Sequence, residues 1–304
     1  MTGFIDSPKR WCPVCDTLVA KDFKPGPGGR PDASCPNCGS LERHRFLAIL
    51  LACLRPTLGS IDVLLDVAPS AQVTPMLGRL GAKRHVRLDL GADNRLVDIL
   101  ASLTDAPFAA DSVDLMVCFH VLEHIPDDRK AMREIARMLR PGGVAILQVP
   151  WRRGTRTDED PDAPEDVRIA RFGQRDHVRY YGDDFEDRLV EAGLSLRRVT
   201  PRSLLGESMC TWLKLGPTEM VWLASPNDHA AVPPFEPEAQ THLTTALDAL
   251  IGELGAEHAA GERERRRAEA AEATVWESRG KPILAAAKDR ARPLVHAARR
   301  RFKR

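Results

Sequence analysis

Two short cysteine pairs near the N-terminus constrain this chain more than any other feature. Cys12 and Cys15 enclose Pro-Val, and Cys35 and Cys38 enclose Pro-Asn. Each pair forms a turn that directs two thiolates at one point, and two such turns make the tetrahedral four-sulfur site that structural zinc prefers. Iron in the same cage is the main alternative. Four unrelated core cysteines would not share both the spacing and the proline. The sequence therefore predicts a zinc ribbon over residues 1–45, with Cys12, Cys15, Cys35 and Cys38 as the metal ligands.

The predicted ribbon has a structural role, because a closed four-sulfur site leaves no open position on the metal. Its roughly 40 residues bury too little apolar surface to fold alone, so the metal would supply folding energy. The whole chain of 304 residues carries 44 basic and 43 acidic side chains. That balance excludes a uniformly basic nucleic-acid coat. The other cysteines lie in apolar stretches and are expected to be buried: Cys53, Cys118 and Cys210.

Apolar stretches in this sequence are short. None reaches the roughly 20 residues that a membrane-spanning helix needs. The longest run, residues 46–54, predicts a buried helix, and the first ten residues lack the apolar core of a secretory signal. We therefore expect a cytoplasmic protein whose thiols are reduced.

Strands and helices alternate along the middle of the chain. One helix is predicted for residues 73–80, ended by Gly81. Another is predicted for residues 127–139, where apolar residues recur at helical spacing until Pro-Gly-Gly ends them. Unbroken apolar runs, typical of buried parallel strands, occupy residues 61–68, 85–90, 113–119 and 144–149. This alternation predicts a doubly wound α/β sheet, which binds ligands at the carboxyl ends of its strands.

Several motifs in this region resemble those of a known family. Val121-Leu122-Glu123-His124-Ile125-Pro126, then a helix, then Leu139-Arg140-Pro141-Gly142-Gly143, resembles the signature of class I S-adenosylmethionine-dependent methyltransferases. The cysteine pairs, residues 39–45, Val67-Ala68-Pro69 and residues 172–182 are similar to a bacterial group with an N-terminal zinc ribbon. The resemblance covers residues 10–200. It implies a Rossmann-like methyltransferase domain of type 11 over residues 46–225.

The resemblance implies a cofactor site at the ends of the first strands. Asp66 ends the first strand, and Ala68 and Pro69 follow where the family at large has glycines, which predicts a loop of different shape. Asp89, at the end of the second strand, is expected to accept the ribose hydroxyls, with Leu90 beside it. A capping carboxylate is the alternative for Asp66, and a solvated turn residue for Asp89. Further cofactor contacts are expected from Ser102, Leu103 and His120.

Catalysis of methyl transfer needs mainly position and a deprotonated acceptor, because the positive sulfur is already a good leaving group. The polar segment 174–181 follows an irregular acidic stretch and is expected to meet the substrate. His177 is the predicted general base, and His124 is a second catalytic candidate. The alternative is a loop held by its own hydrogen bonds. The residues predicted to contact the substrate are Asp176, Arg179 and Tyr180.

The end of the chain has a different composition. Prolines in residues 226–240 predict a linker, and residues 241–304 are expected to form a helical, basic extension. Its leucines form a narrow stripe suited to self-association, and basic side chains dominate after Lys281. Peripheral membrane contact is one alternative, and a disordered or self-associating tail is another. The leucines of the stripe are Leu243, Leu247, Leu250 and Leu254.

The sequence as a whole predicts an S-adenosylmethionine-dependent methyltransferase that carries structural zinc and acts on a small-molecule or glycan-related acceptor. An RNA methyltransferase that grips RNA with ribbon and tail is one alternative, and would bind RNA in a salt-sensitive way. A non-catalytic, zinc-bearing interaction module is the other. The missing glycines favour that module, whereas the retained Leu-Glu-His and Pro-Gly-Gly motifs oppose it.

Overall fold

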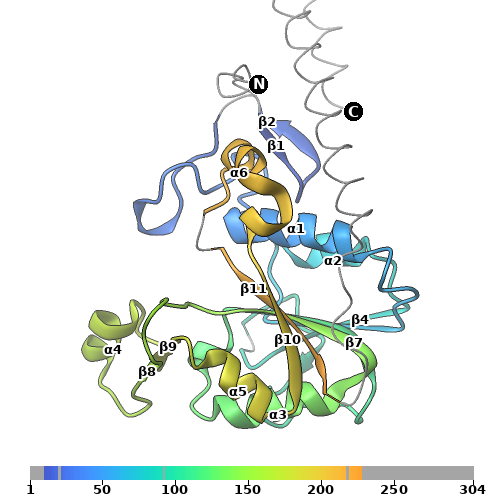
Figure 1. The fold of residues 1–304 in the computed structure, drawn as a ribbon, viewed down its shortest axis with the longest axis vertical. Helices are drawn as coiled ribbons and strands as arrows, with labels where there is room; N and C mark the ends of the chain where they lie inside the picture. The colour runs from blue at the N-terminus through green and yellow to red at the C-terminus, as the bar shows by residue number, and fades with distance from the viewer. Residues whose placement is uncertain (1–9, 20–21, 92, 217–218, 228–304) are drawn as a thin grey trace, which may run out of the picture. The chain divides into compact units, whose positions relative to one another are not determined.

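A seven-stranded sheet forms the centre of the fold. The computed structural model describes residues 10–19, 22–91, 93–216 and 219–227. The strand order is β10-β11-β7-β6-β3-β4-β5 (Figure 1). Neighbouring strands are parallel, except that β11 runs antiparallel to both β7 and β10. The predicted doubly wound α/β fold is thus confirmed. The strands are β3 (Val63–Val67), β4 (Arg84–Asp89), β5 (Ile99–Leu100), β6 (Val113–Phe119), β7 (Leu139–Gln148), β10 (Leu194–Val199) and β11 (Val221–Pro226).

The order of the strands creates a switch point between β3 and β6. The chain runs outward from β3 through β4 to β5, and then returns to the other side of β3 as β6. Val67 pairs with Cys118, so the carboxyl ends of β3 and β6 lie side by side. At such a point the chain segments that follow the two strands run in opposite directions. The space between them can hold a ligand.

Helices cover both sides of this sheet. Helix α3 (Asp128–Met138) and α5 (Phe185–Glu191) contact each other, and α3 also contacts β7 and β11. Figure 1 shows these two helices on one side, with α1 (Glu42–Leu54) and α2 (Thr74–Gly78) on the other. The Asp127 side chain caps α3 by accepting the Lys130 N–H at 2.9 Å. The predicted helix over residues 127–139 is confirmed.

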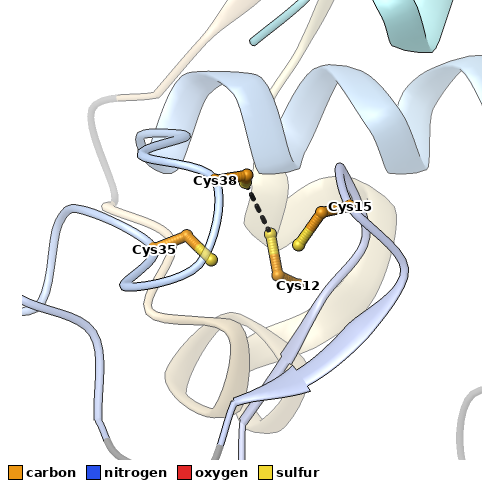
Figure 2. Close-up of side chains that lie close together, drawn as sticks. All are labelled: Cys12, Cys15, Cys35 and Cys38. Carbon is orange, nitrogen blue, oxygen red and sulfur yellow. Dashed lines mark hydrogen bonds between the residues drawn. The ribbon is translucent and has the colours of Figure 1, made fainter. Parts of the chain in front are cut away.

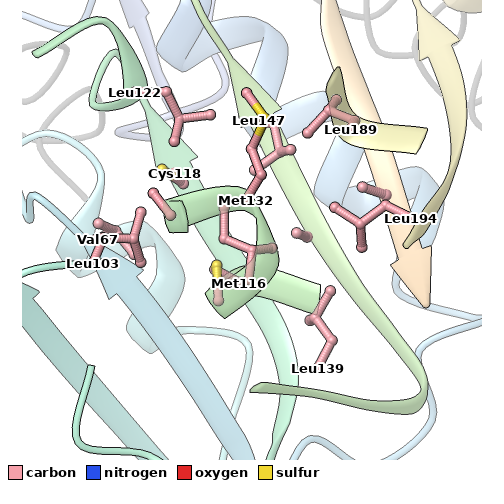
Figure 3. Packing of buried hydrophobic residues seen from close by; sticks show 14 of the residues in the cluster. Val67, Leu103, Met116, Cys118, Leu122, Met132, Leu139, Leu147, Leu189 and Leu194 are labelled. Carbon is pink, nitrogen blue, oxygen red and sulfur yellow. The ribbon is translucent and has the colours of Figure 1, made fainter. Parts of the chain in front are cut away.

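The hydrophobic core between α3, α5 and the sheet is closely packed (Figure 3). Met116 and Leu147 come from adjacent strands, Met132 from α3 and Leu189 from α5, and all are fully buried. Burying one such side chain stabilises the fold by about 1.5–3 kcal/mol relative to leaving it exposed. Leu122 extends this core to the loop after β6. The loop after β6, at the carboxyl edge of the sheet, is therefore anchored in the packed core.

Two predicted elements differ from the observed ones in extent. Strand β7 begins at Leu139, which pairs with Val113, whereas Val144 pairs with Leu115. The Pro-Gly-Gly segment between them is therefore an irregularity within a strand, with Gly142 at a φ of +76°. The helix predicted over residues 73–80 is confirmed only as the shorter α2.

The N-terminal cysteine region is fixed to the sheet domain through α6 (Pro201–Leu213). Strands β1 (Arg10–Cys12) and β2 (Thr17–Val19) form an antiparallel hairpin. Arg10 Nη1 donates to the carbonyl of Trp212 at 3.3 Å, and β1 contacts α6. The boundary expected after residue 45 falls within α1.

Smaller elements complete the described part of the chain. Strands β8 (Asp158–Glu159) and β9 (Arg179–Tyr180) pair beside α4 (Glu165–Phe172), and η1 (Pro27–Gly29) and η2 (Leu122–His124) are short 3-10 helices. No helix among the described residues is long and apolar enough to cross a membrane. The predicted extension 241–304, with its leucine stripe and basic end, lies outside the described residues, as does the linker from residue 228 onward.

Candidate functional site

The loop after β3 begins with an unusual backbone conformation. Ala68 has a φ of +55°, in the left-handed region that residues with a side chain rarely adopt. Its N–H donates to the carbonyl of Leu88 on the neighbouring strand at 2.8 Å. Ala68 thus takes the conformation for which glycine is usually needed. The absence of a glycine does not by itself change the path of the chain at this residue.

Asp89, at the end of β4, is connected to this loop. Its Oδ1 accepts the N–H groups of Leu90 and Gly91 at 2.7 and 3.2 Å. Its Oδ2 accepts Asn94 Nδ2 at 3.0 Å, and the same amide group donates to the carbonyl of Pro69 at 2.9 Å. The structure therefore brings the predicted residues Pro69 and Asp89 together through Asn94. Sequence reasoning missed Asn94, for which the only signal was a polar turn after a strand-ending aspartate.

The other residues predicted for the cofactor site differ in their surroundings. Asp66 is buried, and its Oδ2 accepts the hydroxyl of Thr74 at 2.7 Å, which matches the capping alternative. The Ser102 hydroxyl bonds that of Thr104 at 2.8 Å, and Leu103 is buried. Leu90, by contrast, is 75% exposed beside Asp89. Their cofactor roles stay predictions.

A group of histidines surrounds one carboxylate after β6. His120 has a φ of +55°, and its N–H donates to the Gln148 carbonyl at 2.8 Å. Glu123 is buried, with its Oε1 3.1 Å from His120 Nδ1 and 4.0 Å from His177 Nε2. The rings of His124 and His177 meet edge to face, with their centroids 4.7 Å apart. We call His120, Glu123, His124 and His177 the histidine cluster.

Hydrogen bonds fix the ring orientation of two of these histidines. His177 Nδ1 lies 3.1 Å from the carbonyl oxygen of Phe172, so this nitrogen carries the proton. His124 Nδ1 lies 3.2 Å from the Asp176 carbonyl and 3.3 Å from its carboxylate. These contacts leave Nε2 of each ring without a bond to the same partners. Burial lowers the pKa of His177, although Glu123 opposes the effect, so this ring is neutral at pH 7.

The polar segment 174–181 holds the histidine cluster in place. The Val178 N–H donates to the Glu123 carbonyl at 2.9 Å. The guanidinium of Arg179 is fully buried and donates to the carbonyls of Leu122 and Pro126 at 2.8 Å each, and to that of Ile125. Arg179 thus braces η2 and has no open face for an acceptor in this conformation. The predicted substrate contact of Arg179 stays a prediction.

The remaining residues predicted for the substrate lie at the edges of this segment. Asp176 is exposed and reaches the histidine cluster only through His124. The Tyr180 ring stacks under the guanidinium of Arg152, 3.9 Å from the ring centroid. Neither placement tests a contact with substrate.

Two further polar side chains, unassigned by the sequence, meet near the end of β7. Gln148 is buried, and its Nε2 donates to Glu219 Oε2 at 3.0 Å. Burial raises the pKa of Glu219. Gln148 could have been found as a polar residue ending a predicted strand. Glu219 could not, because its partner is 71 residues away.

The four predicted metal ligands form one cage (Figure 2). Their sulfur atoms all lie within 4.8 Å of one another, and Cys12 Sγ is 3.9 Å from Cys38 Sγ. A tetrahedral zinc ion with bonds of about 2.3 Å separates its sulfur ligands by roughly 3.8 Å. Polar groups surround the sulfurs: Ser40 Oγ lies 3.2 Å from Cys12 Sγ, and Asn37 Nδ2 donates to Cys15 Sγ at 3.4 Å. The donor set fits zinc.

The electrostatics of the cage also fit a cation. A hydrogen bond with Cys35 and burial raise the pKa of Cys12 to about 12, and burial raises the pKa of Cys38. The hydrogen bond with Cys12 lowers the pKa of Cys35, so the proton is held on Cys12. Thiols such as Cys12 and Cys38 keep their protons unless a positive charge stabilises the thiolates. Zinc held by these four residues would supply that charge and tie the hairpin to the loop before α1. The other three cysteines are buried, as predicted: Cys53, Cys118 and Cys210.

Comparison with known proteins finds methyltransferases among the sequences similar to this chain. A family model described as a methyltransferase domain matches residues 65–147. The methyltransferase GfsG of Streptomyces halstedii is 31% identical over 120 residues, which cover 39% of this chain and 41% of that protein. An uncharacterized methyltransferase of Mycobacterium sp. (strain JLS) is 45% identical over 49 residues, or 16% of this chain and 19% of that protein. The chain thus spans less than half the length of these curated relatives.

Solved structures include similar chains as well. The YcgJ protein of Bacillus subtilis matches with a TM-score of 0.39 and 19% sequence identity. The match covers 54% of this chain and 75% of that chain.

Proposed function

We propose that this chain, whose residues 65–147 form a class I S-adenosylmethionine-dependent methyltransferase domain, transfers a methyl group to a small-molecule or glycan-related acceptor. One observation carries the proposal beyond the family match. The carboxyl ends of β3 and β4 are joined through Asn94, which bonds both the Pro69 carbonyl and the Asp89 carboxylate. A carboxylate fixed at this edge, beside a sharp loop, is suited to hold a nucleoside.

The residues at this edge have distinct roles in the proposal. Asp89 accepts a ribose hydroxyl through Oδ2, which accepts one hydrogen bond and keeps a further lone pair, whereas Oδ1 already accepts two N–H groups. The exposed side chain of Leu90 offers apolar surface to the adenine. The chain around Ala68 and Pro69 provides backbone groups for the rest of the cofactor. S-adenosylmethionine, when bound, supplies a methyl group on a positively charged sulfur.

The histidine cluster is the proposed place of the acceptor. It follows β6, which is the direct neighbour of β3 in the sheet, so the cluster and the cofactor loop share one edge. His177 and His124 each use Nδ1 in a hydrogen bond and leave Nε2 for the acceptor, and an unprotonated Nε2 can remove an acceptor proton. Arg179 positions His124 by bracing η2, on which this histidine lies.

Titration of the zinc-loaded protein with S-adenosylhomocysteine in a calorimeter tests the proposal. We expect saturable binding that Asp89→Asn weakens roughly 10- to 100-fold, because a hydrogen bond to a charged group is worth about 1.5–3 kcal/mol. Asp62→Asn is the matched control. Asp62 precedes β3 at the opposite end, and its carboxylate pairs with Lys83 at 2.9 Å. Absence of binding to the folded protein, or equal weakening by both variants, would refute the proposal.

A further inference from the structure

A second group of metal-ligating side chains lies outside the cysteine cage. Glu123, His124 and His177 each offer a ligand atom within 4.8 Å of those of the other two. We propose that these three residues bind a divalent transition-metal ion, and that the acceptor coordinates this ion through a hydroxyl or enol oxygen. The acceptor part rests on the proposed methyltransferase function, whereas the metal site does not.

The orientation of the two imidazoles supports this site. A histidine that binds a metal almost always donates its other ring N–H to a carbonyl or a carboxylate, which fixes the tautomer. His177 donates from Nδ1 to the Phe172 carbonyl, and His124 donates from Nδ1 to Asp176. Both rings therefore keep Nε2 available for the ion, which imidazole binds through an unprotonated ring nitrogen.

Two residues of this group each have a buried polar atom without a hydrogen-bond partner among the described residues. These atoms are His177 Nε2 and Glu123 Oε2. A buried polar atom without a partner destabilises the fold, and a bound cation would supply the missing partner. His177 Nε2 lies 4.0 Å from Glu123 Oε1, too far for a hydrogen bond. Two ligands about 2.1 Å from one ion lie roughly 3–3.5 Å apart, so a small inward shift completes the site.

The surroundings hold the ligands but leave one side open. The Arg179 guanidinium and the Val178 N–H fix the backbone of η2, which carries Glu123 and His124. The side chain of His124 keeps 32% of its surface exposed. An ion can therefore enter from this side, and an oxygen ligand can reach it.

The donor set selects the kind of metal and the chemistry. Two imidazoles and one carboxylate suit zinc, iron, cobalt or nickel, and three protein ligands leave positions open for a further ligand. A bound ion lowers the pKa of an oxygen that coordinates it. With the ion bound, the two imidazoles hold the metal instead of removing the acceptor proton, and the acceptor hydroxyl would lose its proton to solvent water. Its oxygen would then bond the methyl carbon while the carbon–sulfur bond breaks and leaves its electron pair on sulfur.

Cobalt(II) is the probe for this site. The zinc-loaded chain is dialysed against a chelator too weak to empty the cysteine cage, and is then titrated with Co²⁺. We expect one equivalent to bind with visible ligand-field bands and without thiolate-to-cobalt absorption, which would report zinc displacement from the cage. His177→Ala and Glu123→Gln should each weaken binding at least tenfold. His124→Ala, at a partly exposed ring, serves if those variants do not fold.

The control variant and a second ligand separate the two parts of the proposal. His229→Ala removes a histidine remote in sequence, and should leave the cobalt titration unchanged. The metal site is refuted if Co²⁺ binds only by displacing zinc, or binds the three cluster variants as tightly as the parent protein. Binding of S-adenosylhomocysteine is measured alongside. Its failure with cobalt binding intact would refute the methyltransferase function and keep the metal site.

Discussion

At the scale of single residues, one backbone conformation recurs at the ends of two neighbouring strands. Ala68 after β3 and His120 after β6 both have a φ of +55°. This conformation costs an L-residue about 1–2 kcal/mol, so the surrounding structure must enforce it. Each residue donates its N–H to a neighbouring strand, to Leu88 and to Gln148. The strain therefore sits where the chain turns sharply at the proposed cofactor and acceptor sites.

Replacing Ala68 with glycine tests this strain. Ala68→Gly should raise the free energy of unfolding by about 0.5–1 kcal/mol, because relief of the left-handed conformation exceeds the entropy that glycine loses on folding. Urea denaturation measures the change. Ala136→Gly in α3 is the control and should lower stability by about 1 kcal/mol. A similar loss in both variants would contradict the left-handed conformation of Ala68.

His44, in the first turn of α1, should make the protein sensitive to acid. Burial, together with the positive charges of Arg43 and His120, lowers its pKa from 6.5 to about 3. The unfolded chain binds a proton below pH 6.5 while the folded chain does not. Stability is therefore present above pH 6.5 and is lost as the pH falls below it. This histidine should cost about 1.4 kcal/mol between pH 7.5 and 5.5.

His44→Gln isolates that effect. Glutamine at this position still offers an oxygen to the N–H of Leu41, which His44 Nδ1 accepts at 3.2 Å. Unfolding free energies of both proteins at pH 7.5 and 5.5 give the comparison, since the other ionisable groups are shared. If both proteins lost the same unfolding free energy between pH 7.5 and 5.5, His44 would not take up a proton when the chain unfolds.

The residue types at the site could be predicted from the sequence, but their contacts only in part. Asp89 and His120 were identifiable because each follows a recognisable apolar strand. The left-handed φ of Ala68 was not, because alanine disfavours it and only bonds to a neighbouring strand impose it. Arg179 was expected to contact a substrate, but its carbonyl partners lie more than 50 residues away along the chain.

At the scale of elements, α1 joins the cysteine region to the sheet domain. The apolar run of residues 46–54 predicted a buried helix, and this is confirmed, but α1 begins four residues earlier, at Glu42. Arg45 is fully buried in that first part. It donates to the carbonyls of Ala33 at 2.8 Å, Leu213 at 3.1 Å and Lys214 at 3.0 Å. The pattern of apolar residues could not predict that α1 starts at Glu42. Its first residues are polar, and Arg45 is satisfied by carbonyls far away in the sequence.

Arg45→Lys tests the connection. A lysine cannot reach the same carbonyls in one plane, so buried acceptors lose their donors, and we expect a loss of about 2–4 kcal/mol in unfolding free energy. Arg55→Lys is the matched control. Arg55 is exposed and its side chain donates to the carbonyl of Gly59 at 2.7 Å, so its replacement should change stability by less than about 0.5 kcal/mol. Equal effects would mean that the carbonyl contacts contribute little.

At the scale of the whole molecule, the proposed zinc ion would cross-link two segments of the N-terminal region. It holds the β1–β2 hairpin to the loop before α1, and the hairpin in turn contacts α6. The sequence predicted the cage, because the ligands lie in two compact pairs. It could not predict the contact with α6, which joins residues 202 positions apart. Long-range packing is decided by shape and by buried donors, which leave no local pattern.

Loss of the cysteine cage should therefore destabilise the protein beyond the zinc ribbon. Cys35→Ser should lower the zinc released by a thiol-modifying mercurial by one ion per chain, and should lower the melting temperature, because zinc supplies folding energy to a segment this small. Cys210→Ser, at a buried cysteine outside the cage, should leave zinc release unchanged. Release that falls equally in both variants would contradict a four-cysteine site.

The contact between Arg10 and the carbonyl of Trp212 also affects the order in which the chain folds during synthesis. These residues are 202 positions apart, and Arg45 and Leu213 are 168 apart. A ribosome that adds about 5–20 residues per second needs roughly 10–40 seconds to pass from Arg10 to Trp212. All four cysteines emerge early in that interval. Metal capture can thus precede anchoring during synthesis, and the first segment to be made is among the last to reach its final neighbours.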